Sequence, residues 1–452
     1  MSLRFLLIST LFISFNAYTK LKDNKVYTKL KTNEVYTKSK TNEAYVIELK
    51  NKNDINVLRA NPEISFDHPT KKTIEVYGPE GLGDYLNDLG IFNLPIKLSK
   101  KSVLGYPTPE EIDAKVIELT RKYPQITRLD KIGTSIQGRS IYSVKISDNP
   151  DRDELEPEVK YIANMHGDEI VGRELMVLLI EELCAKYESG DERVKQLINS
   201  TEIFIVPSMN PDGAINRRRG NSDWVDLNRD FPDFSTNDDE NTPHGREVET
   251  KSIMAWQKTR NFSLSANFHG GAEVVNYPWD TVGDQHPLHA HVVKISKEYA
   301  DIVPGMRDST EFPGGIVNGY DWYEVNGGMQ DWSYYWHNDL QVTIELSNTK
   351  WPRYSEVERY WNENKVALVE FLSKVHEGAG FKLNGEVKYV SIEDKDTETL
   401  IGIFETKNNQ FYKVLPSGTY SFKFLNQSKK TIYKLDKTIN QSIKHDAYTV
   451  IN

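Results

Sequence analysis

Between Tyr106 and Glu377, short apolar runs alternate with longer segments whose apolar residues recur every three or four positions. Short apolar runs are typical of buried strands, and the longer periodic segments are typical of helices packed on a sheet. The alternation predicts an α/β domain with a mixed, mainly parallel sheet flanked by helices. The expected strands are 141–146, 159–164, 202–207, 264–268 and 342–346, and the expected helices are 109–122, 171–187, 246–259, 286–301 and 355–376.

The sequence changes in character on either side of this central domain, which we place at residues 101–377. A domain usually takes ~100–200 residues, so a chain of 452 residues has room for others. From residue 378 to 452, short alternating strands and turn signals predict a small all-β sandwich. Residues 44–100 predict a small α/β module, with strands near 45–49 and 73–76 and a helix near 82–89. The sequence leaves open whether this module is propeptide-like or an extra layer on the central domain.

The first 17 residues have the pattern of a secretory signal peptide. Arg4 precedes an apolar run from Phe5 to Phe15, and Ala17 provides a small residue for cleavage. Eleven helical residues span ~16 Å, about half of a ~30 Å hydrocarbon core, so the run is too short for a transmembrane anchor. Residues 18–43 repeat a basic nine-residue unit and predict a flexible spacer. We therefore expect a secreted or periplasmic protein without a transmembrane anchor.

The composition excludes several classes of function. A formal net charge of −10 and a pI near 5.6 argue against a nucleic-acid partner, since such binders usually carry a basic face. Cys184 is the single cysteine, which excludes an intramolecular disulfide and a cysteine-built zinc site. A metal site in this chain would therefore need histidine and carboxylate ligands.

Two expected strands end in residues that bind metals. The strand at 159–164 is followed by His166-Gly-Asp-Glu169, and the strand at 264–268 is followed by His269. Zinc takes imidazole nitrogen and carboxylate oxygen, and a set of three protein ligands leaves a fourth position open for catalysis. Glu345 interrupts an otherwise apolar strand. Because open α/β sheets gather ligands at the ends of their strands, we expect these residues to lie together.

With these residues in place, the sequence resembles the zinc metallocarboxypeptidases, and most closely their carboxypeptidase N/E-like (regulatory) branch. The resemblance extends from about Tyr106 to Asn452 and implies the metallocarboxypeptidase fold followed by a transthyretin-like domain. Besides the histidines and Glu169, the motifs that carry it are Asn210-Pro-Asp-Gly213, Asp226-Leu-Asn-Arg-Asp-Phe-Pro232, Asn276-Tyr-Pro-Trp-Asp280 and Trp322-Tyr-Glu-Val-Asn-Gly-Gly-Met-Gln-Asp331.

The resemblance implies a role for each matching residue. One zinc ion would be held by His166, Glu169 and His269. Glu345 would be the general base for a zinc-activated water, and Arg219 would polarise the scissile carbonyl. The residues implied to bind the terminal carboxylate of a peptide substrate are Asn228, Arg229 and Tyr323.

The same resemblance implies a preference for basic residues. Asp280 occupies the position that faces the released side chain, and Gln330 matches the pocket floor. A buried carboxylate favours Arg or Lys, because leaving it unpaired costs several kcal/mol. We therefore expect an exopeptidase that acts on peptide or protein C-termini and removes Arg or Lys.

Alternatives to this interpretation stay open at this point. A peptidoglycan stem-peptide carboxypeptidase on the same scaffold, or a non-catalytic binding protein, would fit parts of the pattern. Arg217 and Arg218 could substitute for Arg219. The histidines at 286, 289 and 291 could hold a second metal, although a solvated helix face is the favoured interpretation. The sequence makes no prediction about oligomeric state.

Overall fold

The computed structural model describes residues 43–49, 52–61, 63–67, 69–70, 72–96, 105–440 and 448–451. All of them fall within one structural unit, 38–452. The expected signal peptide and all of the expected spacer except its last residue, Glu43, lie outside the described residues.

The central domain is built on an eight-stranded sheet with the order β11-β10-β12-β9-β7-β8-β6-β5. Its strands run parallel from β12 through β9 and β7 to β8, and again between β10 and β11, while the remaining neighbours are antiparallel. This confirms the expected mixed, mainly parallel sheet. The strands are β5 (Thr127–Thr134), β6 (Ser140–Ile146), β7 (Glu158–Ala163), β8 (Glu202–Val206), β9 (Phe262–His269), β10 (Glu273–Tyr277), β11 (Ile316–Asn318) and β12 (Leu340–Leu346).

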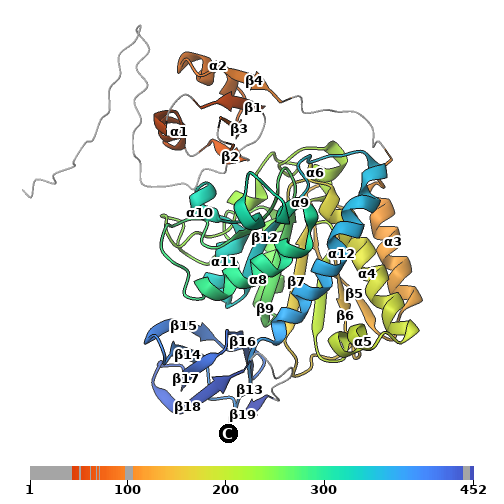
Figure 1. Ribbon diagram of the computed structural model, residues 1–452, viewed down its shortest axis with the longest axis vertical. Coiled ribbons are helices and arrows are strands. Elements are labelled where there is room, and N and C mark those ends of the chain that lie inside the picture. The colour runs from red at the N-terminus through yellow and green to blue at the C-terminus, as the bar shows by residue number, and fades with distance from the viewer. Residues whose placement is uncertain are drawn as a thin grey trace, which may run out of the picture. The chain divides into compact units, whose positions relative to one another are not determined.

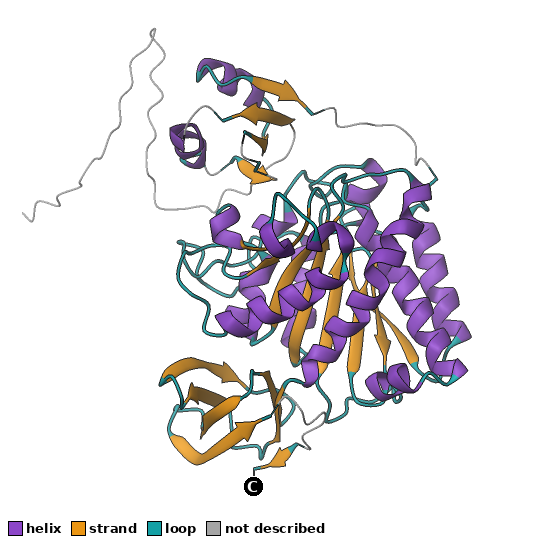
Figure 2. Cartoon of the chain, viewed as in Figure 1, coloured by secondary structure: helices purple, strands orange, loops and turns teal. Residues whose placement is uncertain are grey.

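Helices cover this sheet, as Figure 2 shows. In Figure 1, α3, α4 and α12 lie side by side, and α4 contacts both α3 and α12. The first of them begins with a capping box, in which the Thr108 hydroxyl accepts from Glu111 N and the Glu111 carboxylate accepts from Thr108 N. The helices are α3 (Pro109–Lys122), α4 (Val171–Ser189), α5 (Glu192–Ile198), α6 (Pro211–Asn216), α7 (Val248–Lys258), α8 (His289–Ile302), α9 (Pro304–Arg307), α10 (Gly319–Trp322), α11 (Met329–His337) and α12 (Val357–Ser373).

The expected strands all appear, with ends that differ by no more than two residues. Every residue of β7, β9 and β12 is buried, as expected for central strands covered on both faces. The sequence did not predict β5, β10 and β11. At the edge of the sheet, β5 is mostly half-buried, so it lacks the continuous apolar run that marks a central strand.

The N-terminal module is a four-stranded antiparallel sheet with the order β2-β3-β1-β4. Its first strand begins at Glu43, one residue before the expected boundary, and the Glu43 carboxylate accepts hydrogen bonds from Gly81 N and Gly83 N at 3.0 Å each. Ile47, Val76 and Leu86 are among the residues of its own apolar core. The elements are β1 (Glu43–Glu48), α1 (Lys52–Arg59), β2 (Ser65–Asp67), β3 (Thr73–Gly78), α2 (Leu82–Asp88) and β4 (Asn93–Pro95).

The C-terminal residues form two sheets, with the orders β16-β13-β19 and β15-β14-β17-β18. Phe381 of the first sheet packs on Phe422 and Phe424 of the second, with ring centroids 4.7 and 5.2 Å apart. These all-β strands agree with the expected sandwich. The strands are β13 (Gly378–Lys382), β14 (Tyr389–Asp394), β15 (Thr399–Glu405), β16 (Gln410–Val414), β17 (Gly418–Leu425), β18 (Thr431–Ile439) and β19 (Thr449–Val450).

Within the described ranges, every helix is too short or too polar to cross a lipid bilayer.

Candidate active site

Three buried side chains at the ends of β7 and β9 converge on one point. His166 and Glu169 lie in the turn between β7 and α4, and His269 is the last residue of β9. His166 Nδ1 lies 3.0 Å from Glu169 Oε1 and 3.1 Å from His269 Nδ1, and His269 Nδ1 lies 2.8 Å from Glu169 Oε2. The parallel pairing of β7 with β9 brings the two segments together, although they are about a hundred residues apart in sequence.

This donor set fits a zinc ion. Zinc–ligand bonds of about 2.1 Å in a tetrahedron place neighbouring ligand atoms ~3.4 Å apart, close to the observed separations. Burial would raise the pKa of Glu169, but the two histidines beside it hold that pKa well below its usual range. The group therefore holds an anionic carboxylate beside two imidazole rings, the donor types that zinc takes.

The far ring nitrogens of both histidines have polar partners, as metal-binding histidines usually do. His166 Nε2 lies 2.9 Å from Asp226 Oδ1, and His269 Nε2 lies 2.7 Å from the Asn267 amide nitrogen. Within the described part of the chain, the buried Asn267 Oδ1 has no hydrogen-bond partner. Rotating that amide by half a turn would direct its oxygen at His269 Nε2, which would then donate a proton and leave Nδ1 free for metal.

Glu345 lies beside the metal ligands because of strand register. In the parallel pairing of β12 with β9, Glu345 is opposite His269. The antiparallel pairing on the other side of β12 places it opposite Val274. Its side chain is buried, at 4% exposed, so a carboxylate is held in the interior next to the strand end that carries His269.

Of the three consecutive arginines, only Arg219 reaches the metal group. Its Nε donates to Asp226 Oδ2 at 2.8 Å, and its Nη1 lies 3.1 Å from His166 Nδ1. The guanidinium groups of Arg217 and Arg218 instead lie over the rings of Trp351 and Trp224, 4.6 and 4.2 Å from the ring centroids.

The residues expected to bind a terminal carboxylate are positioned by different contacts. Asn228 Oδ1 accepts from Met329 N at 3.0 Å, which links its loop to the start of α11. Arg229 Nη2 donates to Phe66 O at 2.9 Å, and the Tyr323 hydroxyl donates to Asp67 Oδ1 at 2.9 Å. Arg229 and Tyr323 thus meet at residues 66 and 67 of β2.

Asp280 and Gln330 are in direct contact. Gln330 Nε2 donates to Asp280 Oδ1 at 2.8 Å, and Asn276 Nδ2 donates to the same oxygen at 3.1 Å. A Cβ at Gly319 would overlap this oxygen, so the glycine allows the close approach of α10. Burial raises the pKa of Asp280 to about 7.

The backbone around Asp280 is fixed by Asp331, whose Oδ2 accepts from Asp280 N at 2.8 Å and from Thr281 N at 2.9 Å. This carboxylate holds the segment that carries Asp280, and burial raises its own pKa well above the usual range. Asp331 is the last residue of the motif that begins at Trp322, but the sequence alone assigns it no role.

Sequence reasoning also assigned no role to Asp226, Asn267, Lys350 and Asp67. Asp226 is the first residue of the motif that ends at Pro232. Its contact with His166 Nε2 orients that imidazole ring. Lys350 lies 3.8 Å from Glu169 Oε1 and 2.9 Å from Asp67 Oδ2. No local spacing signals this contact, because Asp67 and Lys350 are 283 positions apart.

The three clustered histidines do not form a second metal group in the described residues. His286 is buried against the rings of Trp279 and Tyr334, with centroids 4.6 and 4.2 Å away. Burial lowers the pKa of His291 to about 3. Both are therefore neutral interior side chains rather than a solvated helix face, which corrects the favoured interpretation for these two positions.

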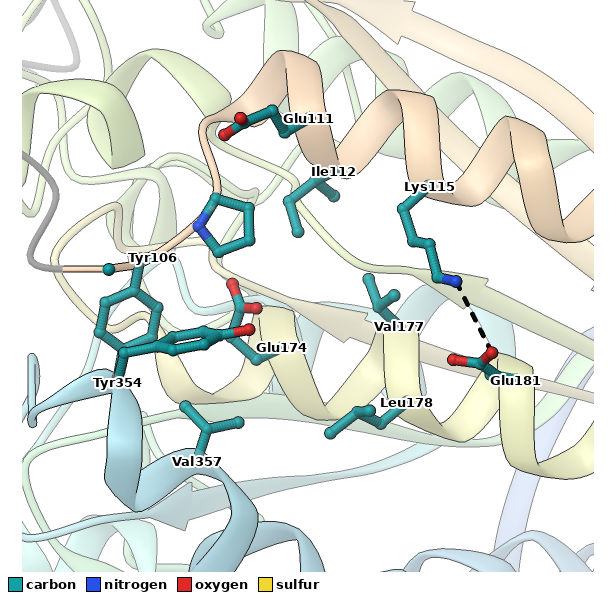
Figure 3. Close-up of a pocket in the computed structure, with 12 residues that line it drawn as sticks. Tyr106, Glu111, Ile112, Lys115, Glu174, Val177, Leu178, Glu181, Tyr354 and Val357 are labelled. Carbon is teal, nitrogen blue, oxygen red and sulfur yellow. Dashed lines mark ion pairs between the residues drawn. The ribbon is translucent and has the colours of Figure 1, made fainter.

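A cavity of about 570 Å³ lies away from these residues, between α3, α4 and the start of α12. In Figure 3, the rings of Tyr106 and Tyr354 lie together at one end, and the ion pair of Lys115 with Glu181 lies at the other. None of the expected metal, catalytic or substrate residues lines it.

Comparison with known proteins agrees with this geometry. The family model described as zinc carboxypeptidase matches residues 112–367, which is more than half of the chain. This chain belongs to the zinc carboxypeptidase family. The resemblance seen in the sequence is therefore confirmed at family level.

Curated relatives include proteins of which this chain spans very different shares. The rat (Rattus norvegicus) carboxypeptidase N catalytic chain is 36% identical over 388 residues, covering 74% of this chain and 84% of the relative. Carboxypeptidase D of Anas platyrhynchos is 40% identical over 331 residues, covering 66% of this chain. The chain spans only 23% of the length of that relative. These relatives are consistent with the regulatory branch.

Solved structures show the same fold. The carboxypeptidase A from Helicoverpa armigera matches with a TM-score of 0.57 at 18% identity, covering 73% of this chain and 96% of the solved chain. At this identity the likeness concerns the fold alone. It confirms the expected metallocarboxypeptidase fold class.

Proposed function

We propose that this protein is a zinc-dependent exopeptidase that hydrolyses the C-terminal peptide bond of peptides and proteins and prefers C-terminal Arg or Lys. The observation that carries the proposal is the convergence of His166, Glu169 and His269, with Glu345 in register beside His269. Family membership and relatives such as carboxypeptidase N support it.

The metal would be held by His166, Glu169 and His269. When bound, zinc supplies a Lewis acid that polarises a carbonyl and makes water more acidic. Glu345, buried next to His269, acts as the general base. It takes a proton from the attacking water and returns it to the leaving amine. Arg219 provides a fixed cation that stabilises negative charge developing on the scissile carbonyl oxygen, and one such donor is worth ~3–4 kcal/mol.

Exopeptidase action follows from the groups around residues 66 and 67. Arg229 and Tyr323 offer a guanidinium and a phenol. Asn228, which precedes Arg229 in the same short turn, adds an amide. A planar carboxylate can take several charge-assisted hydrogen bonds from such groups. A peptide bond in mid-chain has no such anion, so binding favours the chain end.

Specificity for basic residues rests on Asp280, which is 3% exposed. Gln330 and Asn276 both direct amide groups at Oδ1 and so fix the carboxylate. A guanidinium or ammonium group entering this pocket would neutralise a charge that is costly to bury alone. An acidic or apolar side chain would leave that cost uncompensated.

The test uses peptides that end in Arg, Lys, Phe or Glu, incubated with purified protein with and without a zinc chelator. We expect release of Arg and Lys well above Phe and Glu, and loss of all release on chelation. Muropeptide stem peptides serve as a further arm. Turnover of those alone would favour the cell-wall alternative, and chelator-insensitive binding without hydrolysis would favour a binding protein.

We also propose that the protein acts outside the cytoplasm. The support is the signal-peptide pattern of residues 1–17, which lie outside the described residues. N-terminal sequencing of the protein recovered from culture medium or periplasm would test this, with Tyr18 as the expected first residue.

A further inference from the structure

A group of carboxylates lies at the end of β7 that is opposite the zinc ligands. Glu158 is the first residue of β7 and Glu202 is the first residue of β8. The parallel pairing of the two strands places these residues opposite each other. One carboxylate oxygen from each, and one from Asp153 in the preceding loop, lie within 4.8 Å of one another.

Two oxygens of this group are buried without a partner. Glu158 is 1% exposed, and its Oε1 makes no hydrogen bond to any described residue. Glu202 is fully buried, and its Oε2 also lacks a hydrogen bond within the described ranges. The other oxygens are occupied, since Glu158 Oε2 accepts from Asn261 N at 3.0 Å and Glu202 Oε1 accepts from Lys145 Nζ at 2.7 Å. Buried polar atoms are normally satisfied, so these two oxygens indicate a missing partner.

The cation nearest to the unpaired oxygens does not satisfy them. Arg260 Nη1 lies 3.9 Å from Glu202 Oε2, which is beyond hydrogen-bonding distance. The Arg260 guanidinium instead lies over the Phe204 ring, 4.8 Å from its centroid. Burial raises the pKa of Glu158 to about 8, although Arg260 acts in the opposite direction. A further positive charge would therefore be favourable at this place.

The loop before β7 adds more negative charge. Residues 148–158 contain six acidic residues and one arginine. Burial raises the pKa of Glu156 to about 8, and the carboxylates of Asp148, Glu154 and Glu202 act in the same direction. The whole loop thus presents a field that attracts cations.

Asp153 connects the buried carboxylates to solvent. Its residue is exposed, whereas Glu158 and Glu202 are buried. Asn408 Nδ2 donates to Asp153 Oδ2 at 2.9 Å, and Gln410 Nε2 lies 3.4 Å from Oδ1. These contacts position the Asp153 carboxylate while leaving a path by which an ion can enter.

We propose that Asp153, Glu158 and Glu202 bind a calcium ion. Calcium takes carboxylate and other oxygen ligands at about 2.3–2.6 Å in a flexible geometry, so ligands on opposite sides of one ion lie up to ~5 Å apart. Magnesium binds at about 2.0–2.1 Å and demands a near-ideal octahedron, which side chains fixed by strand register supply less readily. The ion would tie the acidic loop to the starts of β7 and β8, and it is independent of the proposed peptidase activity.

The test measures binding of Ca²⁺ to the zinc-loaded full-length protein by calorimetry, with Mg²⁺ as a second titrant. The Tm with and without Ca²⁺ provides a second readout. Glu158→Gln removes one charged ligand and keeps an oxygen that can accept from Asn261 N. Asp153→Asn removes another at an exposed position, where folding should not be disturbed. Asp151→Asn is the matched control, because Asp151 is an exposed carboxylate in the same loop.

We expect a Kd of about 10⁻⁴–10⁻³ M for Ca²⁺, the range of extracellular calcium modules, and weaker binding of Mg²⁺. Ca²⁺ at about 10 mM should then raise the Tm by roughly 2–3 °C. Loss of a supporting contact at a metal site typically costs about 10–100-fold in affinity. Glu158→Gln and Asp153→Asn should therefore raise the Kd by at least about tenfold, and Asp151→Asn should not.

Absence of Ca²⁺ binding to the unaltered protein would overturn the inference, as would equal Kd values for Asp153→Asn and Asp151→Asn. Equal affinity for Mg²⁺ and Ca²⁺ would refute the choice of calcium. Asp148, Glu154 and Glu156 form a neighbouring acidic group. If Glu156→Gln abolished binding while Glu158→Gln and Asp153→Asn left it unchanged, the assignment to the starts of β7 and β8 would be wrong.

Discussion

Replacing Asp280 with Asn tests the origin of the proposed basic specificity. Asn keeps an oxygen that can accept from Asn276 and Gln330, so the shape of the pocket is preserved while the charge is lost. Removing one member of a buried charge pair costs about 2–5 kcal/mol. At about 1.4 kcal/mol for each factor of ten, kcat/KM for a substrate ending in Arg should fall by roughly 30-fold to several thousand-fold.

The pH dependence sharpens this prediction. Burial raises the pKa of Asp280 to about 7, and the charged groups that face it are Arg229, Asp233 and Asp331. The ionised form that attracts Arg is therefore present above pH 7 and is lost as the pH falls through 7. Between pH 8 and pH 6 the ionised fraction falls about tenfold, and the Arg preference of the unaltered enzyme should fall with it.

The assay compares kcat/KM for benzoyl-Gly-Arg and benzoyl-Gly-Phe as a ratio at pH 6, 7 and 8. Any effect of the module or of the metal on both substrates cancels in the ratio. Asp284→Asn is the control, because Asp284 is an exposed carboxylate four residues further on. Equal losses on both substrates for Asp280→Asn, or the same pH slope in both proteins, would refute the assignment of Asp280.

Other substitutions test the catalytic group and the stability of the fold. Glu345→Gln should lower kcat/KM by about 10²–10⁴-fold while zinc content, measured by metal analysis, stays the same. His269→Ala should lose stoichiometric zinc, and the rise in Tm that zinc gives the unaltered protein should disappear. Asp339→Asn removes the partner of Lys160, 2.8 Å away with both side chains fully buried, and should cost about 3–5 kcal/mol in urea unfolding. Asp436→Asn, which breaks an exposed pair, should leave the urea unfolding midpoint nearly unchanged.

The metal group was predictable because its residues stand next to strong local signals. His166 and Glu169 follow an apolar run that forms the fully buried β7, and His269 ends the fully buried β9. Parallel strands bring their carboxyl ends to one edge of the sheet, so a sequence that predicts the strands also predicts the meeting of their last residues. The same reasoning placed Glu345 at the end of β12.

Contacts that depend on tertiary placement were not predictable in this way. The pairing of His166 with Asp226 joins residues 60 positions apart, and the contact of Asp67 with Tyr323 joins residues 256 positions apart. Neither contact repeats with a helix or strand period, so neither leaves a pattern in the sequence. The acidic residues at 67 and 226 are distinguished from surface acids only by the fold that buries them.

The charge balance around Arg219 shows how the fold compensates a buried cation beside the metal group. Arg219 is buried, with the carboxylates of Asp226, Glu169 and Asp67 about it. Asp226 and Glu169 belong to the central domain itself, so this domain alone supplies two carboxylates that compensate the buried cation. In the proposed function, the preference for chain ends rests on Arg229 and Tyr323, while Arg219 acts at the scissile carbonyl.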